Sequence, residues 1–381
     1  MLKTTKKQEI IYGVYDSVNQ PLFRRLNDFF IDRSSVALRE KAYFFQLLAV
    51  MVDAGIPLVH ALKLLAARSE NERFRRVINT IVFTITQGKT FSQSMARFSD
   101  VFDEVEIGIV RAGEAAGNLD KMLNRIADQL GRSNELRTKL VSAAIYPVVV
   151  LTMLLLVTSA MLVWVIPTLV NLLAEGGLQK KDFPVATLIL VNASNIISNY
   201  WWALIFGLLI LVLGVRLFVQ SESGRFWWDS FKLKMPLFGK LLRKIIMLRF
   251  ISVLGVLIES GLPVIRTLQI VAPALKNELY RIKIYEVIAK VQHGAKLSGS
   301  LASSQEMFEE TIVGMLAVGE QSASIGFMSN KIAAQYELEI DHALKRFLSI
   351  LEPLLVVFVG LAVALLALAL LTPIFKLTQL V

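Results

Sequence analysis

Few residues in the 381-residue chain could do chemistry. The sequence contains no cysteine, which excludes disulfides, thiolate nucleophiles, iron–sulfur clusters and cysteine-ligated zinc. The three histidines, His60, His293 and His342, lie far apart in the chain and leave little material for a metal site or a catalytic relay. The sequence shows no paired-carboxylate, nucleophile–base or zinc motif. These residues favour a protein that is not an enzyme and that holds no cofactor or metal.

One tripeptide imitates a nucleotide-binding motif. Gly88-Lys89-Thr90 matches the end of a phosphate-binding loop, but that loop also needs a glycine five residues earlier, where this chain has Phe83. The segment also follows a predicted helix rather than a strand. We therefore interpret it as a turn, and the sequence predicts no nucleotide site.

Three acidic residues are candidate partner contacts. Asp53 and Glu259 lie near the C-terminal ends of predicted helices, where the helix dipole disfavours an anion. Each could pair with a nearby Arg or Lys, or contact a partner protein. Glu352 lies where a membrane helix is predicted to begin, so it could cap the positive end of that helix or face a partner.

Hydropathy places these residues on a membrane protein. Mean hydropathy is +0.56, 55% of the residues are hydrophobic and only 19% are charged, which is too apolar for an ordinary soluble protein. A membrane span needs about 20 apolar residues in a helix. Three segments meet this requirement: 145–170, 200–219 and 351–375. No apolar segment precedes them, so we expect no cleaved signal peptide.

The positive charges predict how these spans are oriented. Of the 41 Lys and Arg residues, only Lys180, Lys181 and Lys376 lie outside residues 1–144 and 216–349. Lys and Arg concentrate in cytoplasmic segments, so we expect the N-terminus in the cytoplasm and the C-terminus on the opposite side. The same rule accounts for the net charge of +10. Binding to nucleic acid is therefore not expected.

An internal repeat constrains the fold independently of charge. A shift of 206 positions aligns residues 43–169 with 249–375 without a gap, and many glycines and prolines coincide. Each copy is a polar segment followed by an outgoing span. Two such copies in parallel need one returning span between them, so the repeat also predicts three spans.

Each copy carries helical signals throughout. Gly113 and Gly319 interrupt helical patterns, which indicates close approach of two helices, and the adjacent Glu114 and Glu320 could fix that contact. We expect an all-α membrane protein with two homologous cytoplasmic bundles of about six helices each and three transmembrane helices. The predicted order is an N-terminal cytoplasmic segment (1–38), the first bundle (39–144), the first span (145–170), a short periplasmic loop (171–199), the second span (200–219), a cytoplasmic linker (220–248), the second bundle (249–350), the third span (351–375) and a periplasmic tail (376–381).

The duplicated pattern resembles the type II secretion system F family over residues 39–376. The residues that carry the resemblance are Gly55, Pro57, Gly113, Glu114, Gly117, Tyr146 and Pro147 in the first copy, and Gly261, Pro263, Gly319, Glu320, Glu352, Pro353 and Pro373 in the second. One departure is Ala323, which stands where the first copy has Gly117, and it predicts an altered turn.

The resemblance implies a non-enzymatic platform protein of the bacterial inner membrane, part of a type IV pilus or type II secretion machine. Its implied partners are a hexameric assembly ATPase, pilin or pseudopilin subunits, other inner-membrane assembly proteins, membrane lipid and further copies of itself. The platform would couple the ATPase to insertion of subunits into the filament. An archaeal-type filament platform protein is an alternative that would be expected to have more spans. A small-solute membrane transporter would need polar residues at membrane depth, and no ionisable side chain in these spans is expected near the middle of the bilayer.

Overall fold

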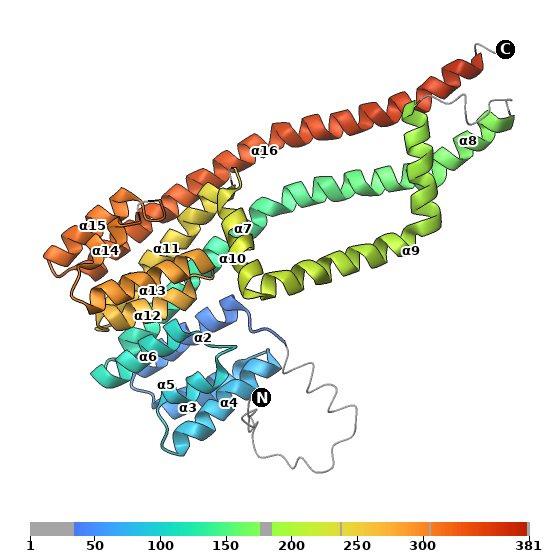
Figure 1. The fold of residues 1–381 in the computed structure, drawn as a ribbon. Coiled ribbons are helices and arrows are strands. Elements are labelled where there is room, and N and C mark those ends of the chain that lie inside the picture. Colours follow the sequence, from blue (N-terminus) through green and yellow to red (C-terminus); the bar gives the residue numbers. More distant parts are fainter. Residues whose placement is uncertain (1–33, 176–184, 237, 305, 379–381) are drawn as a thin grey trace, which may run out of the picture. The chain divides into compact units, whose positions relative to one another are not determined.

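The computed structural model describes residues 34–175, 185–236, 238–304 and 306–378 (Figure 1). Every regular element within these residues is helical. The chain divides into two compact units, one formed by residues 34–137 and 242–339 and the other by residues 138–241 and 340–378. The first unit holds two helical bundles, and the second holds the long apolar helices. The predicted all-α class is thereby confirmed.

The first bundle is built from six helices. They are α2 (Leu38–Asp53), α3 (Leu58–Arg68), α4 (Glu72–Thr86), α5 (Phe91–Met95) with a 3-10 turn (Ala96–Phe98), α6 (Glu104–Ala116) and the first part of α7 (Leu119–Ala160). Side chains of Asn71, Thr90 and Asp103 accept hydrogen bonds from backbone N–H groups at the starts of α4, α5 and α6. Buried phenylalanines form the core, with Phe45, Phe74 and Phe102 in edge-to-face or tilted contact.

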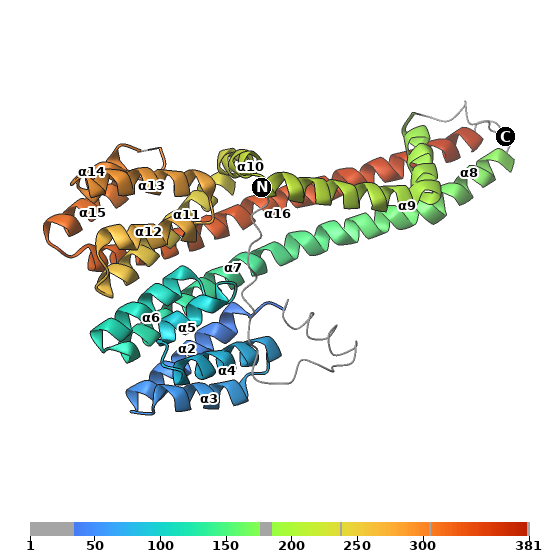
Figure 2. The ribbon, with the colours of Figure 1, turned by 60° about the horizontal axis from the view of Figure 1, so that its bottom comes forward.

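The second bundle repeats this arrangement (Figure 2). Its helices are α11 (Phe238–Glu259), α12 (Val264–Ala274), α13 (Glu278–Gln292), α14 (Leu297–Ala302), α15 (Glu310–Gln321) and the first part of α16 (Ile325–Thr378). Phe308 and Tyr280 occupy the repeat positions of Phe102 and Phe74 and are likewise buried. Six helices in each bundle agree with the prediction.

The turn at Ala323 is not altered, contrary to the prediction. Gly117 has a φ of 69° and Ala323 a φ of 50°, so both residues are left-handed. In both copies the next amide donates to the carbonyl of the motif glycine, Asn118 to Gly113 at 3.1 Å and Ser324 to Gly319 at 2.7 Å. Packing of the helices on either side therefore holds an alanine in a backbone conformation that suits glycine.

We expect Ala323→Gly to stabilise the second bundle by about 1 kcal/mol, because the left-handed conformation is strained for a residue with a Cβ. Hydrogen exchange of the full chain in detergent, followed by mass spectrometry, resolves the two bundles separately. Gly117→Ala is the matched reverse change and should destabilise the first bundle by a similar amount. Equal protection in wild type and Ala323→Gly would contradict the strain argument.

The second unit contains the rest of α7 and α16 and the helices between them. These are a π-helical turn (Met161–Val165), α8 (Ile166–Glu175), α9 (Val185–Gln220) and α10 (Glu222–Lys234). Leu162, Ile166 and Val191 form a small apolar cluster, beside which Ser194 Oγ donates a hydrogen bond of 2.5 Å to the Leu162 carbonyl. This cluster joins the π-helical turn and α8 to the first half of α9.

Two described helices are long and apolar enough to cross a membrane, Leu119–Leu172 and Ile325–Leu368. A third span exists if Thr187–Ala203 and Ile205–Gln220, bent by 61° at their junction, are counted together. Tyr200 lies at this bend, with φ −122° and ψ 23°. Figure 1 shows the bend in α9.

Three predicted boundaries differ from the helices that form. In the predicted loop 171–199, α8 extends to Glu175 and α9 begins at Val185, because the uncharged residues 185–199 contain no glycine or proline; residues 176–184 lie outside the described part. The predicted linker 220–248 is occupied by α10 and the start of α11. In the predicted tail, α16 continues to Thr378, and residues 379–381 again lie outside.

The two prolines at the predicted membrane junctions lie inside helices. Pro147 lies within α7, and Pro353 lies within α16, which begins at Ile325. Glu352 is therefore far from a helix N-terminus. Its predicted role as a cap at the positive end of a helix is wrong, because the helix from the bundle continues into the apolar segment instead of ending before it.

Candidate functional site

The two Gly-Glu motifs form the same structure in both bundles. The carboxylate of Glu114 accepts hydrogen bonds from the backbone N–H groups of Phe91 (2.5 Å) and Ser92 (3.2 Å), the first residues of α5. Glu320 accepts from Leu297 (2.7 Å) and Ser298 (3.2 Å) at the start of α14. These N–H groups have no partner within their own helix, so each carboxylate holds one short helix against the bundle.

The glycines of these motifs lie where two helices approach closely. A Cβ on Gly113 would be 2.7 Å from Met122 Cγ, and one on Gly319 would be 3.1 Å from the Ile325 Cα. At both positions the next helix of the bundle passes directly over the glycine and leaves little room for a side chain. We interpret the Gly-Glu pairs as structural elements of each bundle.

The Gly-x-Pro segments are turns between successive helices. Gly55 and Gly261 have φ values of 80° and 86°, which favour glycine, and Pro57 and Pro263 are the N-cap residues of α3 and α12. Pro373 lies within α16. None of these residues presents a chemically reactive group.

The two bundles contact each other along a seam within the first unit. We define this seam as the contact of α6 and α7 with α11 and α12. Gly108 is buried there, and a Cβ on it would be 2.9 Å from Ile270 Cδ1 and 3.8 Å from Leu257 Cδ2. A glycine at this position thus lets α12 approach α6 closely. The sequence did not single out Gly108, although its repeat partner is also a glycine, Gly314.

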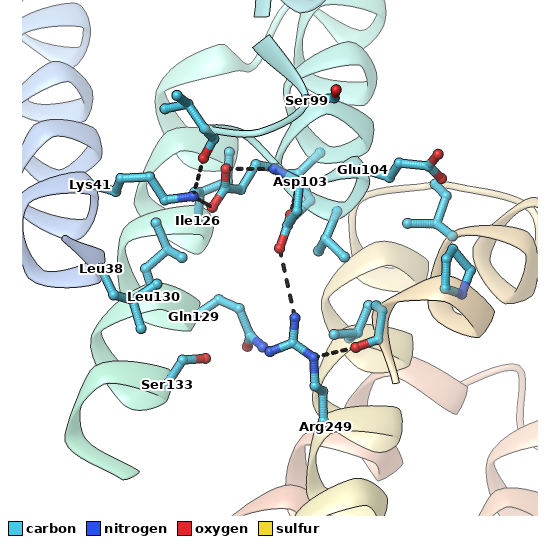
Figure 3. A pocket seen from close by; sticks show the side chains of 18 of the residues that line it. Leu38, Lys41, Ser99, Asp103, Glu104, Ile126, Gln129, Leu130, Ser133 and Arg249 are labelled. Carbon is cyan, nitrogen blue, oxygen red and sulfur yellow. Dashed lines mark hydrogen bonds and ion pairs between the residues drawn. The ribbon is translucent and has the colours of Figure 1, made fainter. Parts of the chain in front are cut away.

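An arginine joins the two sides of the seam. Figure 3 shows Arg249 of α11 pointing toward Asp103, the N-cap of α6. Its guanidinium lies 3.7 Å from the Asp103 carboxylate, and its Nε donates to the Ala274 carbonyl at 2.6 Å. Arg249 therefore fixes α12 and α6 at the same time.

The matched acids Asp53 and Glu259 have different environments. Glu259 accepts a hydrogen bond of 2.6 Å from Asn330 Nδ2 and lies 3.7 Å from Arg125, across the seam. Glu259 is therefore paired within the chain, the first of the two alternatives given for it, and its role as a partner contact stays a prediction. Asp53 is exposed, and among the described residues it has no hydrogen-bond or ion-pair partner. It stays a candidate partner contact.

A cavity of about 850 Å³ lies along the seam, with a buried ion pair in its wall. Lys41 of α2 lies 2.6 Å from Glu106 and donates to the Val101 carbonyl at 2.7 Å (Figure 3). Burial, reinforced by the negative charge of Asp103, raises the pKa of Glu106 to about 7, although Lys41 acts in the opposite direction. The lining mixes acidic, basic and apolar side chains, so it does not favour one class of small ligand.

The second copy has apolar residues at the positions of this ion pair. The repeat positions of Lys41 and Glu106 are Met247 and Ile312, which are both buried. Two charges in one copy thus replace two apolar side chains in the other. Comparison of the repeats could have revealed this pair, since a lysine and a glutamate stand where the second copy has two apolar residues.

The structure brings together two matched residues at the predicted membrane junctions. Tyr146 of α7 and Glu352 of α16 line one pocket of about 260 Å³ in the second unit, together with Leu348. Near this pocket, Lys139 Nζ lies 3.0 and 2.8 Å from the two carboxylate oxygens of Asp341. The outgoing helices of the two copies therefore contact each other where the apolar segments begin. Glu352 is exposed and, among the described residues, has no partner.

The bundles and the apolar segments share continuous helices. Each bundle carries a cluster of packed helices and passes directly into a long apolar helix, α7 or α16. Within the described residues, no three His, Asp or Glu side chains converge as a metal site would require. The exposed acids Asp53 and Glu352 are suited to charge-based contact with another protein.

Comparison with known proteins points to one family. The pattern of the type II secretion system (T2SS) protein F matches residues 44–167 and again 250–373. The chain is 33% identical to the type IV pilus assembly protein PilC of Myxococcus xanthus over 88% of its own length and 79% of the relative. It is 30% identical to the type II secretion system protein F of Pseudomonas aeruginosa, over 91% and 84% of the two chains.

Proposed function

Since the chain belongs to the type II secretion system protein F family and is a multi-pass membrane protein, we propose that it is the inner-membrane platform of a type IV pilus or type II secretion machine. In this role it couples a cytoplasmic assembly ATPase to insertion of pilin or pseudopilin subunits into the filament. The N-terminus and both bundles lie in the cytoplasm, and the C-terminus lies in the periplasm.

The observation that carries this proposal is the continuity of α7 and α16. Each helix begins in a bundle and continues without interruption into a segment apolar enough to cross the membrane. An α-helix rises about 1.5 Å per residue and is held by a hydrogen bond at nearly every residue, so it transmits displacement along its length. A force applied to either bundle by an ATPase would thus reach the bilayer along a continuous helix. The chain itself needs no catalytic group for this role.

The apolar helices supply surface for subunits that leave the bilayer. Gly360 of α16 is exposed, and a Cβ on it would meet no atom within 4 Å. Ala364 lies one turn further on the same helix. Small residues four apart let another apolar helix approach closely, as the membrane-embedded segment of a pilin or pseudopilin would.

We expect Glu352→Gln to reduce filament assembly strongly while leaving the protein folded. Glutamine keeps the size and most hydrogen-bonding capacity but removes the charge, and Glu352 lies exposed at the junction between bundle and span. The measurement is the amount of surface filament or secreted substrate in a strain that carries the variant at wild-type abundance. Assembly at the wild-type level would sink the role of Glu352.

A matched control separates this site from a general loss of charge. Glu337→Gln makes the same change on the same helix, within the bundle, and should leave assembly unaffected. Co-purification of the full chain with the assembly ATPase then tests coupling itself. If neither wild type nor Glu337→Gln retains the ATPase under conditions where the machine assembles, the coupling mechanism must be abandoned.

A further inference from the structure

The seam between the bundles pairs unlike faces of a repeated fold. It uses α6 and α7 of the first bundle and α11 and α12 of the second. The shift of 206 positions relates α6 and α7 to α15 and α16, and it relates α11 and α12 to α2 and α3. Two faces that correspond to the two sides of the seam are therefore exposed among the described residues. We call them the α15/α16 face and the α2/α3 face.

The α15/α16 face has a glycine at the same repeat position as a glycine in the seam. Gly108 is buried and lies against Ile270, whereas its repeat partner Gly314 is exposed, and a Cβ on Gly314 would meet no atom within 4 Å. A glycine inside a helix destabilises it by about 1 kcal/mol relative to alanine. Nothing within the second bundle requires a glycine at position 314. A contact from outside the chain, equivalent to that of Ile270 on Gly108, would favour a glycine there.

Apolar exposure links the α2/α3 face to the other side of the seam. Ile270 is 4% exposed, and its repeat partner Leu64 is 40% exposed. Leu257, which also contacts the Gly108 position, is fully buried, and its repeat partner Met51 is only half-buried. Val50, one residue before Met51, is 59% exposed. The α2/α3 face thus presents apolar side chains at the positions that cover Gly108 in the seam.

The charges at the edge of the seam are also repeated. Arg125 and Glu259 face each other across it at 3.7 Å, and their repeat partners are Lys331 and Asp53. Both of these are exposed, and among the described residues neither forms an ion pair; Lys331 lies only over the ring of Phe327, at 5.6 Å. The α15/α16 face thus carries a base and the α2/α3 face carries an acid. These are the same signs as those of Arg125 and Glu259, which face each other across the seam.

One interaction of the seam has no counterpart. Arg249 and Asp103 correspond to Tyr43 and Glu309, and Glu309 already accepts a hydrogen bond of 2.6 Å from Tyr336. A repeated contact would therefore bury Tyr43 in place of an ion pair. Tyr43 is 60% exposed and carries an apolar ring with a polar tip, which suits an interface.

We propose that the α15/α16 face of one copy binds the α2/α3 face of a second copy, repeating the seam between chains. Leu64 of the second copy would then lie on Gly314, and Asp53 would pair with Lys331. Because the two faces differ, the contact is head-to-tail and can continue from chain to chain, closing into a ring where the rotation permits. This inference is independent of the proposed function, since it concerns only how copies of the chain assemble.

Cysteine cross-linking in membranes tests the contact directly, because the full chain has no native cysteine. Two differently tagged chains, one with Leu64→Cys and the other with Gly314→Cys, are produced together and treated with a short bis-maleimide. We expect a cross-linked product that carries both tags. Each variant produced alone should give none, because a head-to-tail contact never places a residue against its own copy.

The seam itself supplies a positive control. Gly108→Cys with Ile270→Cys in one chain should cross-link within the chain, which adds the mass of one reagent molecule and joins no second chain. If this pair reacts but Leu64→Cys and Gly314→Cys do not, the proposal is overturned. Cross-linking of Leu64→Cys alone would instead indicate a two-fold contact between first bundles, and it would overturn the proposal equally.

A second measurement distinguishes loss of association from loss of folding. Gly314→Leu should leave the bundle folded, since the position is open, but should lower the multimeric fraction by about tenfold through steric exclusion. Gly299→Leu is the matched control, because Gly299 is another exposed helical glycine with no atom within 4 Å of its Cβ position. Light scattering in detergent gives the mass. Equal multimeric fractions for the two variants would contradict the proposal.

Charge exchange tests the edge of the contact. Asp53→Lys should weaken cross-linking about fivefold by placing like charges together, and Lys331→Asp should do the same. The two changes together should restore it. If each single variant cross-links as wild type does, or if the pair fails to recover, Asp53 and Lys331 do not face each other. If these variants lose the binding of a different protein while the mass of the multimer stays the same, that protein covers the face and the proposal is overturned.

Discussion

Replacing Lys41 by Met and Glu106 by Ile together should leave the first bundle nearly as stable as wild type, whereas either replacement alone should destabilise it by about 3–5 kcal/mol. Glu106→Ile leaves the Lys41 ammonium buried without its counter-charge, and Lys41→Met leaves the buried Glu106 carboxyl without its hydrogen-bond donor, since both side chains are less than a tenth exposed. The double change installs the pair that the second copy already uses, Met247 and Ile312. Hydrogen exchange of the first bundle in the full chain measures all three variants.

The double variant should still be slightly less stable than wild type. The side chain of Glu106 also accepts a hydrogen bond of 3.2 Å from the backbone of Asp103, as part of the capping box of α6. Losing that bond removes about 1 kcal/mol. Additive single effects in the double variant would show that Lys41 and Glu106 do not depend on each other, and the explanation by buried charge would fail.

The same pair predicts how stability depends on pH. Burial raises the pKa of Glu106 from 4.5 to about 7, so between these values the folded state keeps a proton that the unfolded state has released. The contribution of this group is fully present below pH 4.5 and is lost as the pH rises toward 7, by at most about 1.4 kcal/mol per pH unit. The double variant lacks this group, so its first bundle should show a flatter profile over the same window.

Glu320→Ala should destabilise the second bundle by about 2–3 kcal/mol, because the Glu320 carboxylate holds the start of α14 through charge-assisted hydrogen bonds. It also accepts a hydrogen bond of 2.6 Å from Ser298 Oγ. The N-cap residue of α14 is Lys296, whose side chain makes no capping hydrogen bond. Glu320 is thus the main side-chain partner of these backbone N–H groups.

Glu114→Ala is the matched variant in the first bundle and should have a smaller effect. There the N-cap of α5 is Thr90, which forms a capping box with Gln93 and holds the helix start independently. Combining Glu114→Ala with Thr90→Ala should therefore bring the loss up to that of Glu320→Ala. Exchange of the α5 and α14 amides reports each helix separately. A larger effect at Glu114 than at Glu320 would refute the division of roles between cap and carboxylate.

Local sequence determined the helices, because their signals act within a few residues. Apolar spacing, the caps at Asn71 and Asp103, and the glycines at 55 and 117 depend only on neighbours along the chain. The internal repeat also predicted the number of bundles and of spans, because two copies of one pattern are expected to fold alike. The family followed from the same residues.

Local signals misled where distant packing overrides them. The prolines at 147 and 353 suggested that helices begin there, but α7 and α16 continue through them because packing in the bundle has already started each helix. Likewise Ala323 keeps the turn that Gly117 makes, since the bonds and helices on either side are the same in both copies.

Tertiary structure alone decided which of two matched residues is buried. Gly108 and Gly314, Ile270 and Leu64, and Glu259 and Asp53 share one local sequence context, yet one member of each pair lies in the seam and the other is exposed. The partners of Glu114 and Lys41 lie 22 to 65 residues away in the chain. Propensity and periodicity describe a residue and its helical neighbours, whereas burial depends on which distant face covers it. Because the seam pairs two unlike faces, it buries only one of the two copies of each face.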